Sequence, residues 1–158
     1  ITQQFPNHQF SWKILGAVLK QTGRISEGVV ASQKAVEINP KDAEAHSNLG
    51  VTLQELKRLE EAEASFRKAI ELKPDYAEAY SNLGIILNEL NRFLDAEVSF
   101  RKAIELNPNF VKAYSNLGNI LRKINNLDEA EIVYRQAIAI KPDYAEAHSN
   151  LGIVLQGL

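Results

Sequence analysis

The sequence repeats itself every 34 residues, as from Pro40 to Pro74, and this period constrains the fold more than any other feature. Four prolines, Pro40, Pro74, Pro108 and Pro142, share this spacing, and Pro6 lies one period before them. Five leucine–glycine pairs have the same spacing and end at Gly16, Gly50, Gly84, Gly118 and Gly152. Residues 43–76 and 77–110 are identical at about two-thirds of their positions. A period of this length indicates small supersecondary units that stack on their neighbours.

Each period contains two amphipathic helical patterns. In the copy that begins at residue 43, Ala45, Leu49 and Leu53 are spaced by four residues. The pattern of Ala62 and Phe66 continues this helical spacing in the second half of the copy. Proline cannot continue a helix, so the four prolines close the units. We expect about nine helices, at residues 9–21, 25–38, 43–56, 60–72, 77–90, 94–106, 111–124, 128–140 and 145–157.

Two motifs carry a family resemblance. Trp12-x2-Leu15-Gly16-x2-Leu19, with its later copies, and Ala62-x3-Phe66-x2-Ala69-x4-Pro74 resemble the tetratricopeptide repeat (TPR). The resemblance covers residues 9–158. It implies an all-α fold, a right-handed superhelix of antiparallel helix hairpins. The expected parts are a remnant of a preceding repeat (1–8), a divergent first repeat (9–42), three further repeats (43–76, 77–110, 111–144) and the first helix of a truncated repeat (145–158).

Small and aromatic residues explain this template physically. We expect Gly50 and Ala62 to lie where paired helices approach closely, and Phe66 and its equivalents to fill the space between hairpins. The first repeat departs from the pattern, because Gly28 replaces the alanine and Ser32 the aromatic residue. We therefore expect the first repeat to be the least stable.

Both ends of the chain predict a piece of a longer array. The sequence contains no methionine, even at position 1, so we expect it to begin after the translation start. Solenoids usually end in a polar capping helix, whereas the last predicted helix carries Leu151 and Leu155. The alternative is an array that caps itself by association with a second copy.

Composition excludes several classes of protein. A formal charge of −2 argues against a nucleic-acid-binding protein. The absence of cysteine rules out disulfides and thiolate metal sites, and we expect no metal and no cofactor. No apolar run reaches the roughly 18–20 residues of a membrane-spanning helix, so we expect no membrane partner and a cytoplasmic location.

The sequence contains no recognisable catalytic motif, and we predict that the chain is not an enzyme. His46 and His148 occupy a repeat position that elsewhere holds Trp12, Tyr80 or Tyr114. We interpret this position as a packing site for a ring rather than a catalytic or metal-binding site.

In the TPR family the first helix of each hairpin lines a concave groove. Transferred to this sequence, the resemblance implies a peptide-binding face made of one row of asparagines and two rows beyond it. The candidate residues are Asn48, Asn82, Asn116, Asn150, Val51, Ile85, Asn119, Ile153, Gln54, Asn88 and Arg122.

An asparagine side chain both donates and accepts hydrogen bonds, so a row of asparagines can pair with the main chain of an extended peptide. The row resembles the asparagine ladder of O-GlcNAc transferase repeats. The alternative is a local hydrogen-bonding preference near the helix crossing. A second row, Ser47, Ser81, Ser115 and Ser149, comes just before the asparagines.

Charge changes sign along the predicted groove. Glu44, Glu55, Glu78 and Glu89 make its first part acidic, whereas Lys112, Arg122 and Lys123 make the fourth repeat basic. This order suits a ligand with a basic segment followed by an acidic one. A solvated surface of mixed charge is the alternative. The carboxylate clamp of chaperone-binding TPR proteins is missing, because Ser47, Glu78 and Asn82 stand where basic residues are expected.

The leading hypothesis is a scaffold that binds an extended peptide or partner protein of unknown identity. One alternative is a substrate-recruiting array of a larger glycosyl- or sulfotransferase-type protein, since bacterial TPR arrays of this kind are often fused to such domains. Another alternative is a structural module that self-associates through its last helix.

Overall fold

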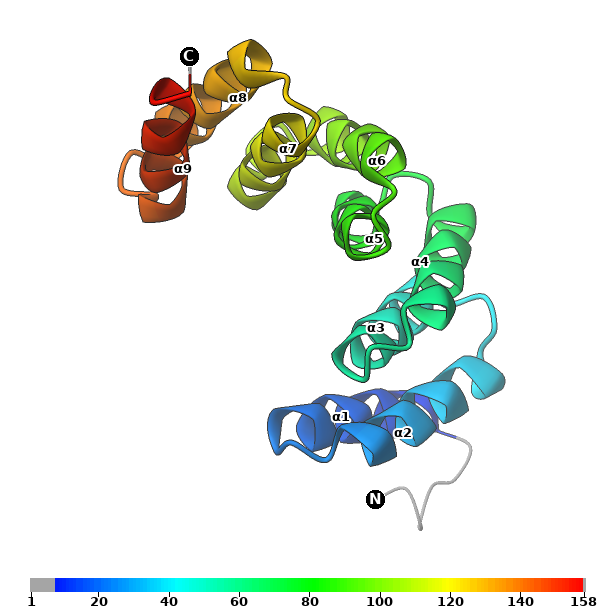
Figure 1. The fold of residues 1–158 in the computed structure, drawn as a ribbon. Helices are drawn as coiled ribbons and strands as arrows, with labels where there is room; N and C mark the ends of the chain where they lie inside the picture. Colours follow the sequence, from blue (N-terminus) through cyan, green and yellow to red (C-terminus); the bar gives the residue numbers. More distant parts are fainter. Residues whose placement is uncertain (1–7, 158) are drawn as a thin grey trace. The chain divides into compact units, whose positions relative to one another are not determined.

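The computed structural model describes residues 8–157, so the expected remnant of a preceding repeat lies outside the described residues, apart from His8. Within this range the chain forms nine α-helices joined by short turns (Figure 1). Their bounds are α1 Gln9–Gln21, α2 Ile25–Ile38, α3 Ala43–Glu55, α4 Leu59–Leu72, α5 Ala77–Glu89, α6 Phe93–Leu106, α7 Val111–Lys123, α8 Leu127–Ile140 and α9 Ala145–Leu155. The expected helices all form, with ends that differ from the prediction by at most two residues.

The chain divides into two compact units, residues 1–79 and 80–158, and the boundary falls within α5. In the first unit α1 packs on α2, α2 on α3, and α3 on α4. In the second unit α6 packs on α7, α7 on α8, and α8 on α9. In addition, the first helices of neighbouring hairpins touch directly, α1 with α3 and α7 with α9.

A left-handed residue ends the first helix of each hairpin. Gly23, Lys57, Asn91 and Asn125 occupy the same repeat position and all have a positive φ, between 58° and 76°. After α3, the N–H of Lys57 donates to Gln54 O at 2.9 Å and the N–H of Arg58 donates to Leu53 O at 3.0 Å. This is the Schellman arrangement that stops a helix, and it explains why α3 ends one residue before the prediction.

The core of each later hairpin is a contact between a glycine and an aromatic ring. Phe66, Phe100 and Tyr134 are fully buried, and each ring lies against the glycine of the first helix of its own hairpin. A Cβ added to Gly50 would lie 2.9 Å from Phe66, and one added to Gly118 would lie 2.6 Å from Tyr134. The glycine therefore lets the two helices approach to the distance that the ring fills.

The first hairpin has no ring at this position. A Cβ on Gly16 would lie 2.9 Å from Ser32 Oγ, and one on Gly28 would lie 3.4 Å from both Gly16 O and the Thr52 methyl group. The two glycines thus let the backbones come close where the other hairpins use an aromatic side chain. The lower stability expected of this hairpin stays a prediction.

Glycine-to-alanine substitutions test the ring contact, because Gly152 is a matched control with no atom within 4 Å of an added Cβ. Gly84→Ala pushes a methyl group to 2.8 Å from Phe100. We expect it to lower the free energy of unfolding by about 1–2 kcal/mol, since overpacking outweighs the better helix propensity of alanine.

In Gly152→Ala only the propensity term remains, so we expect a gain of about 0.5–1 kcal/mol. Urea unfolding followed by circular dichroism measures both changes. Equal effects of the two substitutions would refute the ring contact as the constraint on helix spacing.

Candidate functional site

Three helices of the second unit, α5, α7 and α9, present the predicted asparagines. Asn82, Asn116 and Asn150 occupy the same repeat position and are each partly exposed. Lys123 of α7 donates to Asn88 Oδ1 of α5 at 2.7 Å, and Asn150 of α9 donates to Asn119 Oδ1 of α7 at 3.1 Å. Polar side chains therefore connect the first helices of this unit.

A cavity of about 340 Å³ lies between α5 and α7, and we call it the α5–α7 cavity. Eight residues line it: Ile85, Asn88, Phe100, Asn116, Asn119, Ile120, Arg122 and Lys123. The cavity brings together Ile85, Asn88, Asn116, Asn119 and Arg122, all of which are candidates from the sequence. Asn82, Asn150 and Ile153 do not line it.

The side-chain oxygen of Asn119 accepts a hydrogen bond from a buried tyrosine. Tyr134 OH donates to Asn119 Oδ1 at 2.7 Å, and Asn150 Nδ2 donates to the same oxygen. Burial raises the pKa of Tyr134, although the nearby Arg122 works in the opposite direction, so this hydroxyl stays protonated and donates. With the oxygen accepting two hydrogen bonds, the N–H₂ group is the part of Asn119 that can donate to a ligand.

Two cations line the same cavity. Lys123 is fixed by its hydrogen bond to Asn88 and lies 5.1 Å above the ring of Phe93. Arg122 Nε is buried and makes no hydrogen bond within the described part of the chain. Buried polar atoms are rarely without a partner, so this nitrogen calls for an explanation.

The first unit carries three further candidates, Asn48, Val51 and Gln54. Asn48 is exposed, and Val51 and Gln54 are partly exposed. Asn48 lines a small cavity of about 40 Å³ together with Lys13, Gly16, Ala17, Lys20, Ser32 and Thr52. This cavity is too small for more than a single side chain.

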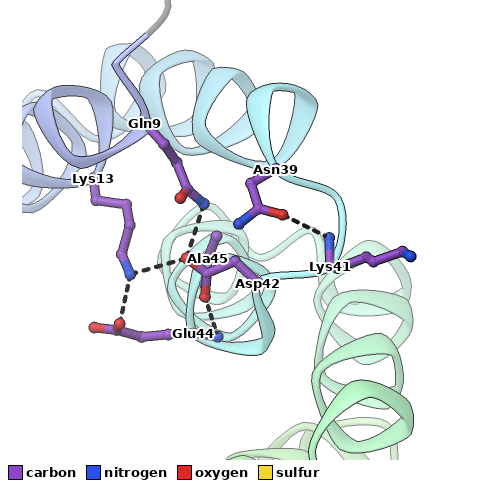
Figure 2. Close-up of polar contacts among 7 residues, drawn as sticks. All are labelled: Gln9, Lys13, Asn39, Lys41, Asp42, Glu44 and Ala45. Carbon is purple, nitrogen blue, oxygen red and sulfur yellow. Dashed lines mark hydrogen bonds and ion pairs between the residues drawn. The ribbon is translucent and has the colours of Figure 1, made fainter.

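Lys13 and Asp42 fix the α1–α3 contact in this unit (Figure 2). Lys13 Nζ lies 3.2 Å from Asp42 Oδ2 and 2.5 Å from Glu44 Oε2, and Gln9 Nε2 donates to Asp42 at 2.8 Å. Asp42 Oδ1 also caps α3, because it accepts from the N–H groups of Glu44 and Ala45. The ammonium group of Lys13 is therefore used in ion pairs within the protein.

The serine row has a structural position that the sequence did not indicate. Ser47, Ser81 and Ser115 are buried. Ser115 Oγ donates to Glu146 Oε1 at 3.0 Å, which joins α7 to α9. Lys13, at the same repeat position in the first unit, contacts Glu44 in the equivalent way. At this repeat position Ser115 and Lys13 therefore connect neighbouring first helices.

The sequence indicated Lys123 only as a source of positive charge in the groove, and Tyr134 was not predicted as a residue of the site. A signal for Tyr134 was present, because the fourth repeat changes two coupled positions at once. The residue 15 positions before Phe66 is Val51, and the one 15 positions before Phe100 is Ile85. The same two positions of the fourth repeat hold Asn119 and Tyr134. A hydroxyl on the buried ring and an amide above it are a matched polar substitution.

The histidines contact the turns. His46 Nε2 lies 2.9 Å from Pro40 O, and His148 Nε2 lies 2.7 Å from Pro142 O. Across residues 8–157 no group of three or more histidine, aspartate or glutamate side chains is placed to hold a metal ion. No helix in that range has the length and apolar character needed to cross a membrane.

Family models match most of the chain. A model described as TPR repeat matches residues 16–57 and 118–158, and two described as tetratricopeptide repeat match residues 41–109 and 99–132. The chain belongs to the tetratricopeptide-repeat family. The all-α fold predicted from the sequence is thereby confirmed, and TPR proteins are a family of protein-interaction modules.

Solved structures with the same fold include MamA, at 27% identity and a TM-score of 0.84, over 90% of this chain and 83% of that one. They also include YrrB, described as "a TPR protein with an unusual peptide-binding site", at 22% identity, a TM-score of 0.80, and 99% and 80% coverage.

A third is the first TPR domain of Spaghetti (RPAP3) bound to the HSP90 peptide SRMEEVD, at 24% identity, a TM-score of 0.72, and 73% and 92% coverage. No curated protein matches the sequence.

The Lys13–Asp42 contact of this TPR chain predicts a pH-dependent stability. Burial acts to raise the pKa of Asp42, but the N–H of Ala45, Lys13 and Gln9 outweigh it and leave the pKa below its usual value. A lowered pKa contributes stability above the unfolded-state value of about 3.9, and this contribution is lost as the pH falls through the folded-state value.

We expect Asp42→Asn to lower the free energy of unfolding by about 1–2 kcal/mol near pH 7, because asparagine still caps the helix but loses the charge. The difference should shrink as the pH falls below about 4. Glu37→Gln, which breaks the exposed Lys34–Glu37 pair, is the control and should change little. A pH-independent difference in urea unfolding would show that the charge does not matter.

Proposed function

We propose that this chain is a non-enzymatic binding module, and that its second unit holds an extended peptide on the face formed by α5, α7 and α9. The observation that carries the proposal is the α5–α7 cavity, which has Asn116 and Asn119 on one side and Ile85 and Asn88 on the other. YrrB and the RPAP3 domain share the fold and are described with a peptide-binding site and a bound peptide.

The polar chemistry of this face suits main-chain recognition. Asn82 and Asn116 stand one repeat apart and each offers a carbonyl oxygen and an N–H₂ group. An extended peptide presents the same two groups at every residue, so it can pair with both asparagines whatever its side chains are. Ile85 adds an apolar contact beside them.

The first unit offers the same repeat positions in Asn48, Val51 and Gln54. Its cavity is much smaller, since Lys13, Gly16 and Ser32 close around Asn48. We therefore assign peptide binding to the second unit. The partner is a protein or peptide, and the proposal includes no cofactor and no catalytic step by this chain.

The test is peptide selection from a display library on the immobilised chain, followed by affinity measurement by fluorescence anisotropy. We expect Asn82→Ala/Asn116→Ala to weaken a selected peptide at least about tenfold, since each lost pair of hydrogen bonds costs about 1 kcal/mol or more. Alanine is a better helix former than asparagine, so this variant keeps its fold.

Glu105→Ala/Gln136→Ala on α6 and α8 is the control, because both residues line a different cavity, of about 420 Å³. Main-chain recognition also predicts that alanine at most peptide positions changes the affinity little, whereas N-methylation of the peptide backbone abolishes binding. If the control variant loses binding as the asparagine variant does, the peptide lies elsewhere. If the library yields no binder, the proposed function is wrong.

Self-association is a second candidate function, because α9 has an uncovered apolar face. Ile153 and Leu155 are about half exposed. Rings contact Gly50, Gly84 and Gly118, whereas no described residue lies within 4 Å of a Cβ added to Gly152. A second copy of the chain can cover this face.

Sedimentation velocity over a dilution series tests this candidate. If self-association occurs, the wild-type chain forms a concentration-dependent dimer and Leu155→Glu is monomeric, because the new carboxylate cannot be buried in the interface. Wild type that stays monomeric at the highest concentration rules the dimer out.

A further inference from the structure

The lining of the α5–α7 cavity is basic. Among the described residues that line it, Arg122 and Lys123 are cationic and none is an aspartate or glutamate. The equivalent pair in the preceding repeat is Asn88 and Glu89, and in the second repeat it is Gln54 and Glu55. The fourth repeat has therefore exchanged a neutral and an acidic residue for two basic ones at one end of α7.

Three side chains that line the cavity, those of Arg122, Lys123 and Asn119, carry hydrogen-bond donors. Arg122 Nε is buried without a partner within the described residues, and a buried cationic donor left unpaired costs more than an exposed one. Asn119 presents N–H₂, because Tyr134 and Asn150 both donate to its oxygen. Lys123 uses one of its three N–H groups on Asn88 Oδ1.

We propose that Arg122, Lys123 and Asn119 bind a carboxylate of the peptide, so that the second unit selects ligands with an acid at one position. The inference rests on the proposed peptide-binding function and adds the chemistry of the ligand. A carboxylate offers two acceptor oxygens and a negative charge, which matches the guanidinium group of Arg122, the ammonium group of Lys123 and the amide donor of Asn119. These residues are not at the missing clamp positions Ser47, Glu78 and Asn82.

Two peptide groups supply a carboxylate, an aspartate or glutamate side chain and the free C-terminus. The cavity of about 340 Å³ has room for either. Selection from two library formats separates them, because one format displays random peptides with a free C-terminus and the other joins the C-terminus to the display protein. Acid-dependent binders from both formats identify a side chain, and binders from the free format alone identify the C-terminus.

Arg122→Gln is the principal variant, because glutamine keeps hydrogen-bonding capacity and removes the charge. We expect one selected peptide to bind wild type at least about tenfold more tightly than its Glu→Gln or C-terminally amidated version. With Arg122→Gln the two versions should bind about equally, so that the effects of the two changes are not additive. Arg135→Gln, an exposed arginine of α8, is the control and should keep the preference.

Tyr134→Phe tests the positioning of Asn119 and should fold, because Phe66 and Phe100 fill the same site in other hairpins. Without the hydroxyl, Asn119 is free to rotate its amide, and we expect the preference for the acid to fall a few-fold while binding of the neutral peptide is unchanged. A loss of binding to both versions would instead indicate disturbed packing and would count against a positioning role.

The outcomes separate the two proposals. Selected peptides with no acid preference, or an acid preference that survives Arg122→Gln, overturn the carboxylate site and leave peptide binding intact. A preference lost equally in Arg135→Gln reflects the overall charge and also overturns the site. If wild type selects no peptide from either format, peptide binding itself fails and the carboxylate site fails with it.

Discussion

The contact of a glycine with a buried ring determines how closely the two helices of a hairpin approach. At Gly50, Gly84 and Gly118 a single added carbon would enter the space of Phe66, Phe100 or Tyr134. Because this contact recurs in successive repeats, these hairpins have the same thickness and neighbouring first helices come side by side within a unit. In the second unit, the proposed binding by Asn82 and Asn116 therefore depends on the glycine–ring contacts of α5 and α7.

In the fourth repeat, a changed residue in the core contacts a changed residue on the first helix. Tyr134 keeps the ring of Phe100 and adds a hydroxyl, and the residue above it becomes Asn119 instead of Ile85. The buried tyrosine donates to the oxygen of the asparagine, and Asn119 lines the same cavity as Arg122 and Lys123. A row that is otherwise apolar thus becomes a set of hydrogen-bond donors without any change in helix geometry.

The fold was predictable because periodicity and proline position depend only on residue types along the chain. The helix ends, the shared position of the asparagines and the family followed from them. The side-chain partners did not follow, since spacing gives the face of a helix but neither a rotamer nor a contact across helices. Lys13 forms ion pairs with Asp42 and Glu44, and Ser47, Ser81 and Ser115 are buried. Arg122 Nε is buried without a hydrogen bond within the described residues. Each of these features depends on three-dimensional packing.

Nuclear magnetic resonance of the asparagine side chains tests whether the first helices of the second unit bind peptide through the α5–α7 cavity. A selected peptide is titrated into ¹⁵N-labelled protein, and the side-chain amide signals are followed. Peptide binding at this cavity predicts saturable shifts of Asn88, Asn116 and Asn119 at one common affinity, with little change at Gln136 on α8. Shifts at Gln136 and along α6 and α8, with the asparagine amides unmoved, would contradict it.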